Sequence, residues 1–242
     1  MESPVKAVIL DMDGVITQTA KLHSKAWKEM FDRYNHRREN KGQEKYSDFD
    51  LREDYSEHVD GVPRYKGVEA FLTSRNITLT YGNEDDEPGE ETICGLGNWK
   101  NELFHEYLKR EGVEVYEDAV EKVKEWKAKG LKTALISSSK NSKLALESAG
   151  LTELFDVCID GIVSIKRKLK GKPDPDIFLE AARELNVTPD EAAVVEDSLA
   201  GIKAGIDGKF KIVIGVARNN NEEQLKSRGA HIAVNNLRLL HF

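Results

Sequence analysis

An apolar run near the start of the chain constrains the fold most. Residues 5–10, Val-Lys-Ala-Val-Ile-Leu, lead directly into Asp11-Met12-Asp13-Gly14. A short and nearly continuous apolar run is typical of a strand buried on both faces, as in the interior of a parallel sheet. Acids at the carboxyl end of such a strand are not needed for packing, and open α/β sheets bind their ligands there. The sequence therefore predicts that Asp11 and Asp13 belong to a functional site.

Beyond Gly112, apolar runs alternate with segments of helical periodicity. We expect strands at residues 131–137, 155–159, 192–195, 211–216 and 231–234, and helices at 118–129, 141–149, 176–185, 198–206 and 222–228. Strands that alternate with helices pair in parallel, because each helix carries the chain back to the start of the next strand. The predicted fold class is therefore α/β, with a doubly wound parallel sheet.

The stretch between the first strand and Gly112 has a different sequence pattern, which predicts helices and loops rather than strands. We expect helices at 19–34, 66–75 and 96–111, and a turn at 60–65. Residues 81–91 carry six acidic side chains together with Gly and Pro, which predicts an exposed, mobile loop without a function. We therefore expect an α/β catalytic core of residues 1–18 and 114–242. A helical cap, residues 19–113, would be inserted after the first strand as a substrate-specificity lid.

Composition excludes several classes of partner. The net charge is −7, and the one basic block is Lys166-Arg167-Lys168-Leu169-Lys170, so nucleic acid is not an expected partner. No apolar run approaches the roughly 20 residues of a membrane span, and no signal peptide is evident. We expect a cytoplasmic monomer that does not bind membranes. Cys94 and Cys158 are expected to be free thiols, the second of them buried.

Three predicted strands end in polar groups: Asp11 with Asp13, Ser137 with Ser138 and Ser139, and Glu196 with Asp197. The carboxyl ends of parallel strands meet at one edge of a sheet, so these groups can converge. Lys172 lies in the loop between the last two strand ends. Clustered carboxylates repel one another unless a cation lies among them, and oxygen ligands suit Mg²⁺ rather than Zn²⁺. We therefore expect a Mg²⁺ site.

These groups are suited to phosphoryl chemistry. A lysine and hydroxyl groups beside Mg²⁺ can hold a phosphoryl group. One carboxylate can attack phosphorus to form an aspartyl-phosphate, and a second can serve as general acid and base. Simpler interpretations exist for each later motif. Ser137 or Ser139 could cap a helix, Lys172 could be solvated, and Glu196-Asp197 could only begin the next helix.

In this order and spacing, Asp11-Met12-Asp13-Gly14, Ser137, Lys172 and Glu196-Asp197 resemble the motifs of the haloacid dehalogenase superfamily. The resemblance implies that Asp11 is the nucleophile and Asp13 the general acid and base. It implies that Ser137 and Lys172 hold the transferring phosphate. It also implies that Asp11, the backbone carbonyl of Asp13 and Asp197 bind Mg²⁺, with Glu196 in or beside that shell.

A closer similarity, to the β-phosphoglucomutase-like subfamily, covers nearly the whole chain. It rests on residues 13–17, 22–27, 139–141, 171–178 and 196–202. It implies conversion of β-glucose 1-phosphate to glucose 6-phosphate through a bisphosphate, with a small phosphorylated sugar as the substrate. The substrate-binding residues that it implies are His23, Arg64, Lys100, Ser138, Ser139, Lys140 and Asn141, with Arg64 on the phosphate that is not transferred.

This chain departs from the compact mutases in three places. Its cap is longer by the acidic loop and by the stretch before Gly95-Leu96-Gly97, and Gln18 replaces an acid. These departures leave the core chemistry intact but leave the substrate open, and a phosphatase that acts on a small sugar phosphate is the alternative. A non-catalytic module that keeps only the fold is a third hypothesis, and the intact acids argue against it. Within the cap, His23 could instead be an ordinary core residue and Arg64 a simply exposed one.

Overall fold

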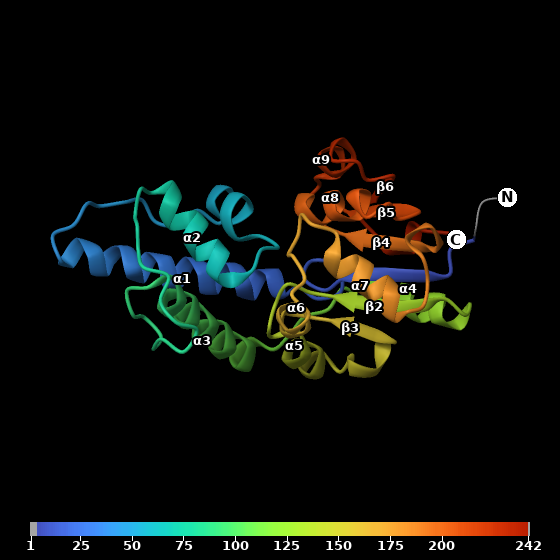
Figure 1. Cartoon of the computed structure of the whole chain (residues 1–242), viewed down its shortest axis with the longest axis horizontal. Helices are drawn as coiled ribbons and strands as arrows, with labels where there is room; N and C mark the ends of the chain where they lie inside the picture. The colour runs from blue at the N-terminus through green and yellow to red at the C-terminus, as the bar shows by residue number, and fades with distance from the viewer. Residues whose placement is uncertain (1–3, 242) are drawn as a thin grey trace. The chain divides into compact units, whose positions relative to one another are not determined.

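Six parallel strands form one sheet in the order β3-β2-β1-β4-β5-β6, with β1 between β2 and β4 (Figure 1). The structure is a computed structural model, and it describes residues 4–241. The strands are β1 Ala7–Asp11, β2 Lys132–Ile136, β3 Val157–Ile159, β4 Ala192–Glu196, β5 Ile212–Val216 and β6 Ile232–Val234. The predicted doubly wound parallel sheet is confirmed. The chain order reverses at β1, so its carboxyl end adjoins the switch point where such sheets bind ligands.

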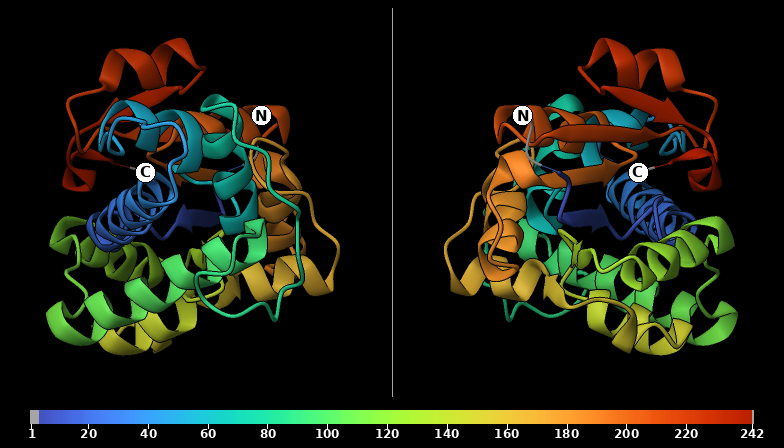
Figure 2. Two further views of the ribbon diagram at one scale, coloured as in Figure 1. Left: turned by 90° about the vertical axis from the view of Figure 1, so that its left-hand side faces the viewer. Right: turned by 90° about the vertical axis from the view of Figure 1, so that its right-hand side faces the viewer.

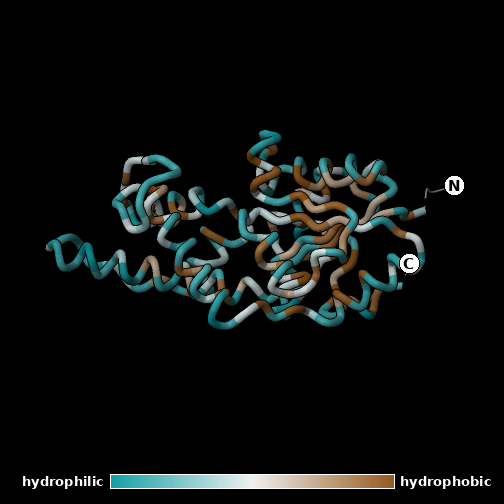
Figure 3. Tube along the Cα trace, turned by 90° about the horizontal axis from the view of Figure 1, so that it is seen from below, coloured by the Kyte–Doolittle hydropathy of each residue, from teal (hydrophilic) through white to brown (hydrophobic). Residues whose placement is uncertain are grey.

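Both faces of the sheet are buried. In β1, Ala7 and Ile9 pack into one hydrophobic cluster, whereas Val8 and Leu10 pack into a second one on the opposite face. The strands are accordingly the most hydrophobic segments of the chain (Figure 3). This is why β1 reads as a continuous apolar run rather than an alternating one. The register sets Asp11 of β1 opposite Ile136 of β2, so that the strand ends meet at one edge.

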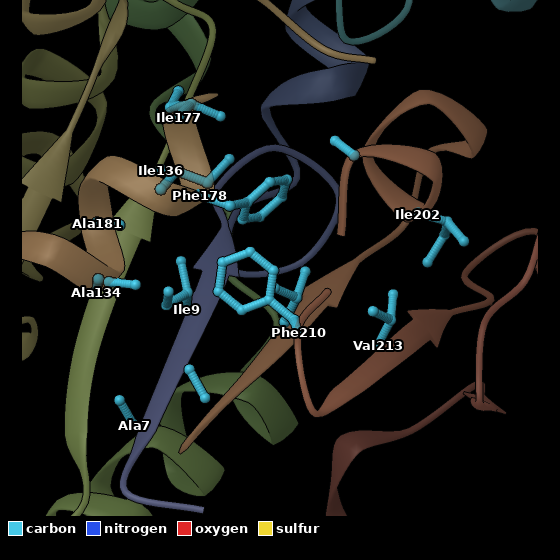
Figure 4. Close-up of a cluster of buried hydrophobic side chains, with 14 of the residues drawn as sticks. Ala7, Ile9, Ala134, Ile136, Ile177, Phe178, Ala181, Ile202, Phe210 and Val213 are labelled. Carbon is cyan, nitrogen blue, oxygen red and sulfur yellow. The ribbon is translucent and has the colours of Figure 1, made fainter. Parts of the chain in front are cut away.

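Helices cover the sheet on both faces (Figure 2). The first cluster receives side chains from α7 (Asp176–Glu184), α8 (Leu199–Asp207) and α9 (Glu222–Ser227). Figure 4 shows Phe178 of α7 and Phe210 within it, and their ring centres lie 6.1 Å apart. The second cluster receives α4 (Glu117–Ala128) and α5 (Ser142–Ala149). The remaining short elements are α6 (Gly161–Lys166) and the 3₁₀ turns Thr152–Leu154, Pro189–Glu191 and Leu237–Leu239.

The chain divides into two compact units, one made of the segments up to Thr19 and from Val113 onward, the other of Ala20–Gly112. The second unit contains α1 (Thr19–Asn40, from its second residue), a π-helix (Tyr55–Val59), α2 (Arg64–Ser74) and α3 (Ile93–Glu111). Its buried aromatic side chains contact one another, and they are those of Trp27, Phe31, Phe49 and Phe71. The chain leaves the first unit after Thr19 and returns to it at Val113. These two points are neighbours within the first unit, because Gln18 N donates to Glu114 O at 2.8 Å.

Several local predictions were wrong. Helix α1 continues six residues past Tyr34, α6 was not predicted, and Arg64 begins α2 rather than lying in a turn. Cys158 is exposed on the edge strand β3, since no further strand covers it. Within the described residues 4–241, no helix combines the length and the apolar composition needed to span a membrane.

Candidate active site

The turn after β1 presents the first two acids. Asp11 is the last residue of β1 and is buried. Gly14, with φ +86°, donates its N–H to Thr17 O at 2.8 Å and closes the turn. A Cβ atom at Gly14 would lie 1.8 Å from Oδ2 of Asp197. Glycine therefore serves two purposes here, because it adopts the left-handed conformation and lets the Asp197 carboxylate approach the backbone.

The Asp13 carboxylate is oriented by hydroxyl groups. Thr19 donates to one of its oxygens, and Ser137 Oγ donates to the other at 3.3 Å. The hydroxyls of Thr17 and Thr19 lie 2.7 Å apart. Ser137 Oγ also accepts from Ser139 N at 3.0 Å, so Ser137 organises the loop after β2 rather than capping a helix. Sequence reasoning missed Thr17 and Thr19. Their spacing after Asp13 was visible, but only the folded turn shows that the Thr19 hydroxyl donates to Asp13 and that the Thr17 hydroxyl lies beside it.

Lys172 is buried, with 5% of its surface exposed, so the solvated interpretation is wrong. Its Nζ lies 2.5 Å from Oδ1 of Asp11 and 3.3 Å from Oε1 of Glu196. Burial alone would lower the pKa of Lys172, but the carboxylates of Asp11 and Glu196 raise it above its ordinary value. Lys172 is therefore a fixed cation at the end of β1.

Glu196 ends β4 and is fully buried beside helix α8. Ser198 Oγ donates to Glu196 Oε1 at 2.5 Å, and Ser198 also caps α8 by accepting from Gly201 N at 3.0 Å. A Cβ atom at Gly201 would lie 2.1 Å from Cδ of Glu196. Ser198, and not Glu196 or Asp197, is the helix cap. Both acids are therefore available to the site, in space that Gly14 and Gly201 leave for them.

The carboxylates of Asp11, Glu196 and Asp197 can each offer one oxygen, and these oxygens lie within 4.8 Å of one another. Burial raises the pKa of Asp11 well above its ordinary value, Lys172 opposes this, and Glu196 adds to it. One lysine leaves the three carboxylates with excess negative charge, which a divalent cation would offset. An all-oxygen donor set fits Mg²⁺.

The loop after β2 carries Ser138, Ser139, Lys140 and Asn141, all partly exposed at the same edge. Ser139 Oγ accepts from Asn141 N at 3.1 Å, which orders the chain at the start of α5. Gly161 N donates to Ser139 O at 3.0 Å. The four predicted substrate residues therefore lie next to Ser137 on a loop that has its own hydrogen bonds.

The remaining predicted residues gather inside the second unit. Lys100 Nζ lies 2.6 Å from Nδ1 of His23, whose ring stacks on Phe104 with 4.2 Å between ring centres. Burial holds the pKa of His23 well below its usual range, and the positive charges of Lys100 and Arg64 lower it further. His23 is thus neutral in a cationic setting. It is not an ordinary apolar core residue, since its ring nitrogen faces a buried lysine.

A doubly wound sheet that gathers three acids, a buried lysine and serine hydroxyls at its switch point defines a class of proteins, the phosphoryl-transfer enzymes that use an aspartate nucleophile. The model of the haloacid dehalogenase-like hydrolases matches residues 5–208, and the chain belongs to that family. Its relatives place it with the β-phosphoglucomutase-like proteins.

Three similarities support this placement. The chain is 42% identical to the β-phosphoglucomutase of Mycobacterium tuberculosis, over 96% of this chain and 90% of that protein. It is 29% identical to a phosphorylated carbohydrates phosphatase of Thermotoga maritima, over 90% and 88% of the two chains. The crystal structure of β-phosphoglucomutase from Clostridium difficile matches with a TM-score of 0.78 at 26% identity, over 98% of this chain and 94% of that one.

Proposed function

We propose that this protein is a Mg²⁺-dependent phosphotransferase, and specifically a mutase that converts β-glucose 1-phosphate to glucose 6-phosphate through a bisphosphate. The observation that carries the proposal is the contact between Lys172 and Asp11 inside a cluster of acids at the switch point of the sheet. The 42% identity to a β-phosphoglucomutase over most of both chains supports the mutase reaction.

The first step forms a bond between an Asp11 oxygen and phosphorus, and breaks the bond from phosphorus to the donor oxygen. Asp13, as the carboxylic acid, supplies a proton to that leaving oxygen, and Thr19 and Ser137 hold its carboxyl group in place. Lys172 and Ser137 stabilise the negative charge on the transferring group. In the second step Asp13 takes a proton from the acceptor hydroxyl, whose oxygen attacks phosphorus and frees Asp11.

Asp11, Asp197 and Glu196 would hold the Mg²⁺ ion. When bound, the ion supplies positive charge that offsets the charge on the transferring phosphoryl group. Within the protein itself, Lys172 is the cation that faces Asp11 and Glu196. Gly14 and Gly201 have no side chains, so the carboxylates of Asp197 and Glu196 can occupy the space beside their backbones.

Residues 20–112 would serve as the cap and provide the second phosphate site. A mutase must hold a phosphate at each end of its sugar, and this unit contains its own group of basic residues, Arg64, Lys100 and the neutral His23. Arg64 suits the phosphate that is not transferred, because a guanidinium can donate two hydrogen bonds to phosphate oxygens.

A phosphatase that hydrolyses a small sugar phosphate is the second candidate. It is favoured by the similarity to the phosphorylated carbohydrates phosphatase of T. maritima. It requires the same core chemistry, with water instead of a sugar hydroxyl as the acceptor in the second step. The two functions therefore differ in the acceptor and not in Asp11, Asp13 or Lys172.

Phosphorus NMR of one incubation with β-glucose 1-phosphate, Mg²⁺ and a bisphosphate primer separates the candidates. A mutase yields glucose 6-phosphate and the bisphosphate, whereas a phosphatase yields inorganic phosphate. Arg64→Ala should lower isomerisation by about 10-fold or more, since it removes a charge-assisted bidentate contact, and should affect hydrolysis of a one-phosphate substrate far less. Asp11→Asn should abolish both reactions. Wild-type protein that forms no glucose 6-phosphate would exclude the mutase.

A further inference from the structure

The acidic loop, residues 81–91, makes backbone and side-chain contacts with the start of α3 that the sequence did not predict. Gly89 N donates to Gly95 O at 3.0 Å. A Cβ atom at Gly95 would lie 2.7 Å from the backbone oxygen of Glu90. Asp86 accepts from the hydroxyl of Thr92, the N-cap of α3, at 2.6 Å. The loop backbone therefore rests directly on α3, at a position where only glycine leaves enough room.

Two residues further along the same helix, Gly97 lies against the start of α2 instead of the acidic loop. A Cβ atom at Gly97 would lie 2.6 Å from the ring of Tyr65 and 3.3 Å from Cγ of Arg64. The two glycines of Gly95-Leu96-Gly97 thus let the acidic loop and the start of α2 approach one turn of α3. This explains a glycine pair early in a helix, where glycine is otherwise unfavourable.

Asn98, the next residue, joins these two neighbours. Its Nδ2 donates to the backbone oxygens of Glu84 and Asp86, each at 2.9 Å. Its Oδ1 accepts from the hydroxyl of Tyr65, also at 2.9 Å. The Arg64 guanidinium lies 5.0 Å from the centre of the Tyr65 ring and donates to its hydroxyl at 3.5 Å. A continuous path of contacts therefore runs from the acidic loop through Asn98 and Tyr65 to Arg64.

We propose that Asn98 and Tyr65, held by the acidic loop, are positioning residues for Arg64 that set the affinity of the second phosphate site. This inference rests on the proposed role of Arg64 in binding the phosphate that is not transferred. Neither residue needs to touch the substrate. Their effect comes from fixing the guanidinium of a long and flexible side chain before the phosphate arrives, which reduces the entropy lost on binding.

Asn98→Ala tests the proposal, because it removes the link to the loop and the acceptor for Tyr65. We expect the KM for β-glucose 1-phosphate and for the bisphosphate primer to rise about 3- to 10-fold, the effect of one or two lost hydrogen bonds. The kcat and the hydrolysis of p-nitrophenyl phosphate, which has one phosphate, should change less than about 2-fold. Tyr65→Phe, which removes one hydroxyl, should shift KM in the same direction.

A double-mutant cycle with Arg64→Ala shows whether Asn98 acts through Arg64. In the Arg64→Ala background, Asn98→Ala should have little further effect on KM, because the residue that it positions is gone. Fully additive effects would overturn the proposal. Asn35→Ala is the matched control, since Asn35 is a buried asparagine of the same unit that donates to Ser47 O at 3.4 Å. It should leave KM unchanged.

A measurement that does not depend on activity separates this inference from the proposed function. In protein with ¹⁵N-labelled arginine, the side-chain Nε–H signal of Arg64 should shift or broaden in Asn98→Ala and stay unchanged in Asn35→Ala. An unchanged signal in Asn98→Ala would overturn the positioning role, even in an active mutase. A changed signal in a protein that forms no glucose 6-phosphate would refute the mutase reaction and leave the positioning of Arg64 intact.

Discussion

At the scale of single residues, the site depends on charges that are buried together. Lys172, Asp11 and Glu196 are each less than a tenth exposed, and they are stable there only because they face one another. The identity of each residue could be predicted from the sequence, because four motifs occur in order. Their burial and mutual contacts could not, since lysine and glutamate are usually exposed.

The neutral state of His23 gives a prediction for stability. The folded pKa of His23 lies well below the ordinary value, so below about pH 6.5 the unfolded chain takes up a proton that the folded chain does not. Stability is therefore full above that pH and falls as the pH decreases, by up to about 1.4 kcal/mol per pH unit for one group. His23→Gln should weaken this dependence in chemical denaturation between about pH 7.5 and about pH 5.5.

His36, an exposed histidine on the same helix, provides the control for that measurement. His36→Gln removes a histidine from the same helix and leaves the contact between His23 and Lys100 in place. An identical dependence in the wild type and in His23→Gln would contradict the depressed pKa of His23.

At the scale of elements, the predicted strands and most helices agree with the structure, because both faces of the sheet are apolar and helical periodicity is strong. The errors fall where that signal is weak. The last residues of α1, 35–40, are polar and offer no periodic pattern. Helix α6 is only six residues long and begins with an Asp160 cap. Its apolar residues do not share one buried face, because Ile162 and Ile165 are exposed whereas Val163 packs against the core.

Helix α7 links core packing to the site. Phe178 is fully buried, packs edge-on against Phe210, and its ring centre lies 5.8 Å from Lys172 Nζ. Phe178→Ala should lower the free energy of unfolding by about 3–5 kcal/mol, because it removes an aromatic ring from a close-packed core. Leu179→Ala, at a partly exposed position on the same helix, should cost less than about 1 kcal/mol. Equal losses in urea denaturation would contradict this account of the core.

At the scale of the whole molecule, the order of strands brings distant residues together. Asp11 and Asp197 are separated by most of the chain, yet they meet because β1 and β4 are parallel neighbours. The cytoplasmic location and the monomeric state stay predictions.

Mg²⁺ should stabilise the whole protein, because its expected ligands come from the ends of two different strands, β1 and β4. A ligand that binds only the folded state, at a concentration of about a hundred times its Kd, raises the free energy of unfolding by about 2.7 kcal/mol. This corresponds to a Tm increase of about 5 °C or more. The increase, measured by thermal unfolding with and without a chelator, should be largely lost in Asp197→Asn. Asp207→Asn, at the far end of α8, should retain it. An equal shift in both variants would place the ion elsewhere.

The sequence by itself determined the fold class, the order of the motifs and the identity of the acids and the lysine. These follow from local patterns, namely apolar runs, helical periodicity and spacing. Only the tertiary structure decided that Thr19 faces Asp13, that Gly14 and Gly201 make room for two carboxylates, and that Asn98 joins the acidic loop to Tyr65. Such contacts depend on which backbones approach each other closely, and that distance is set by the packing of segments far apart in the chain.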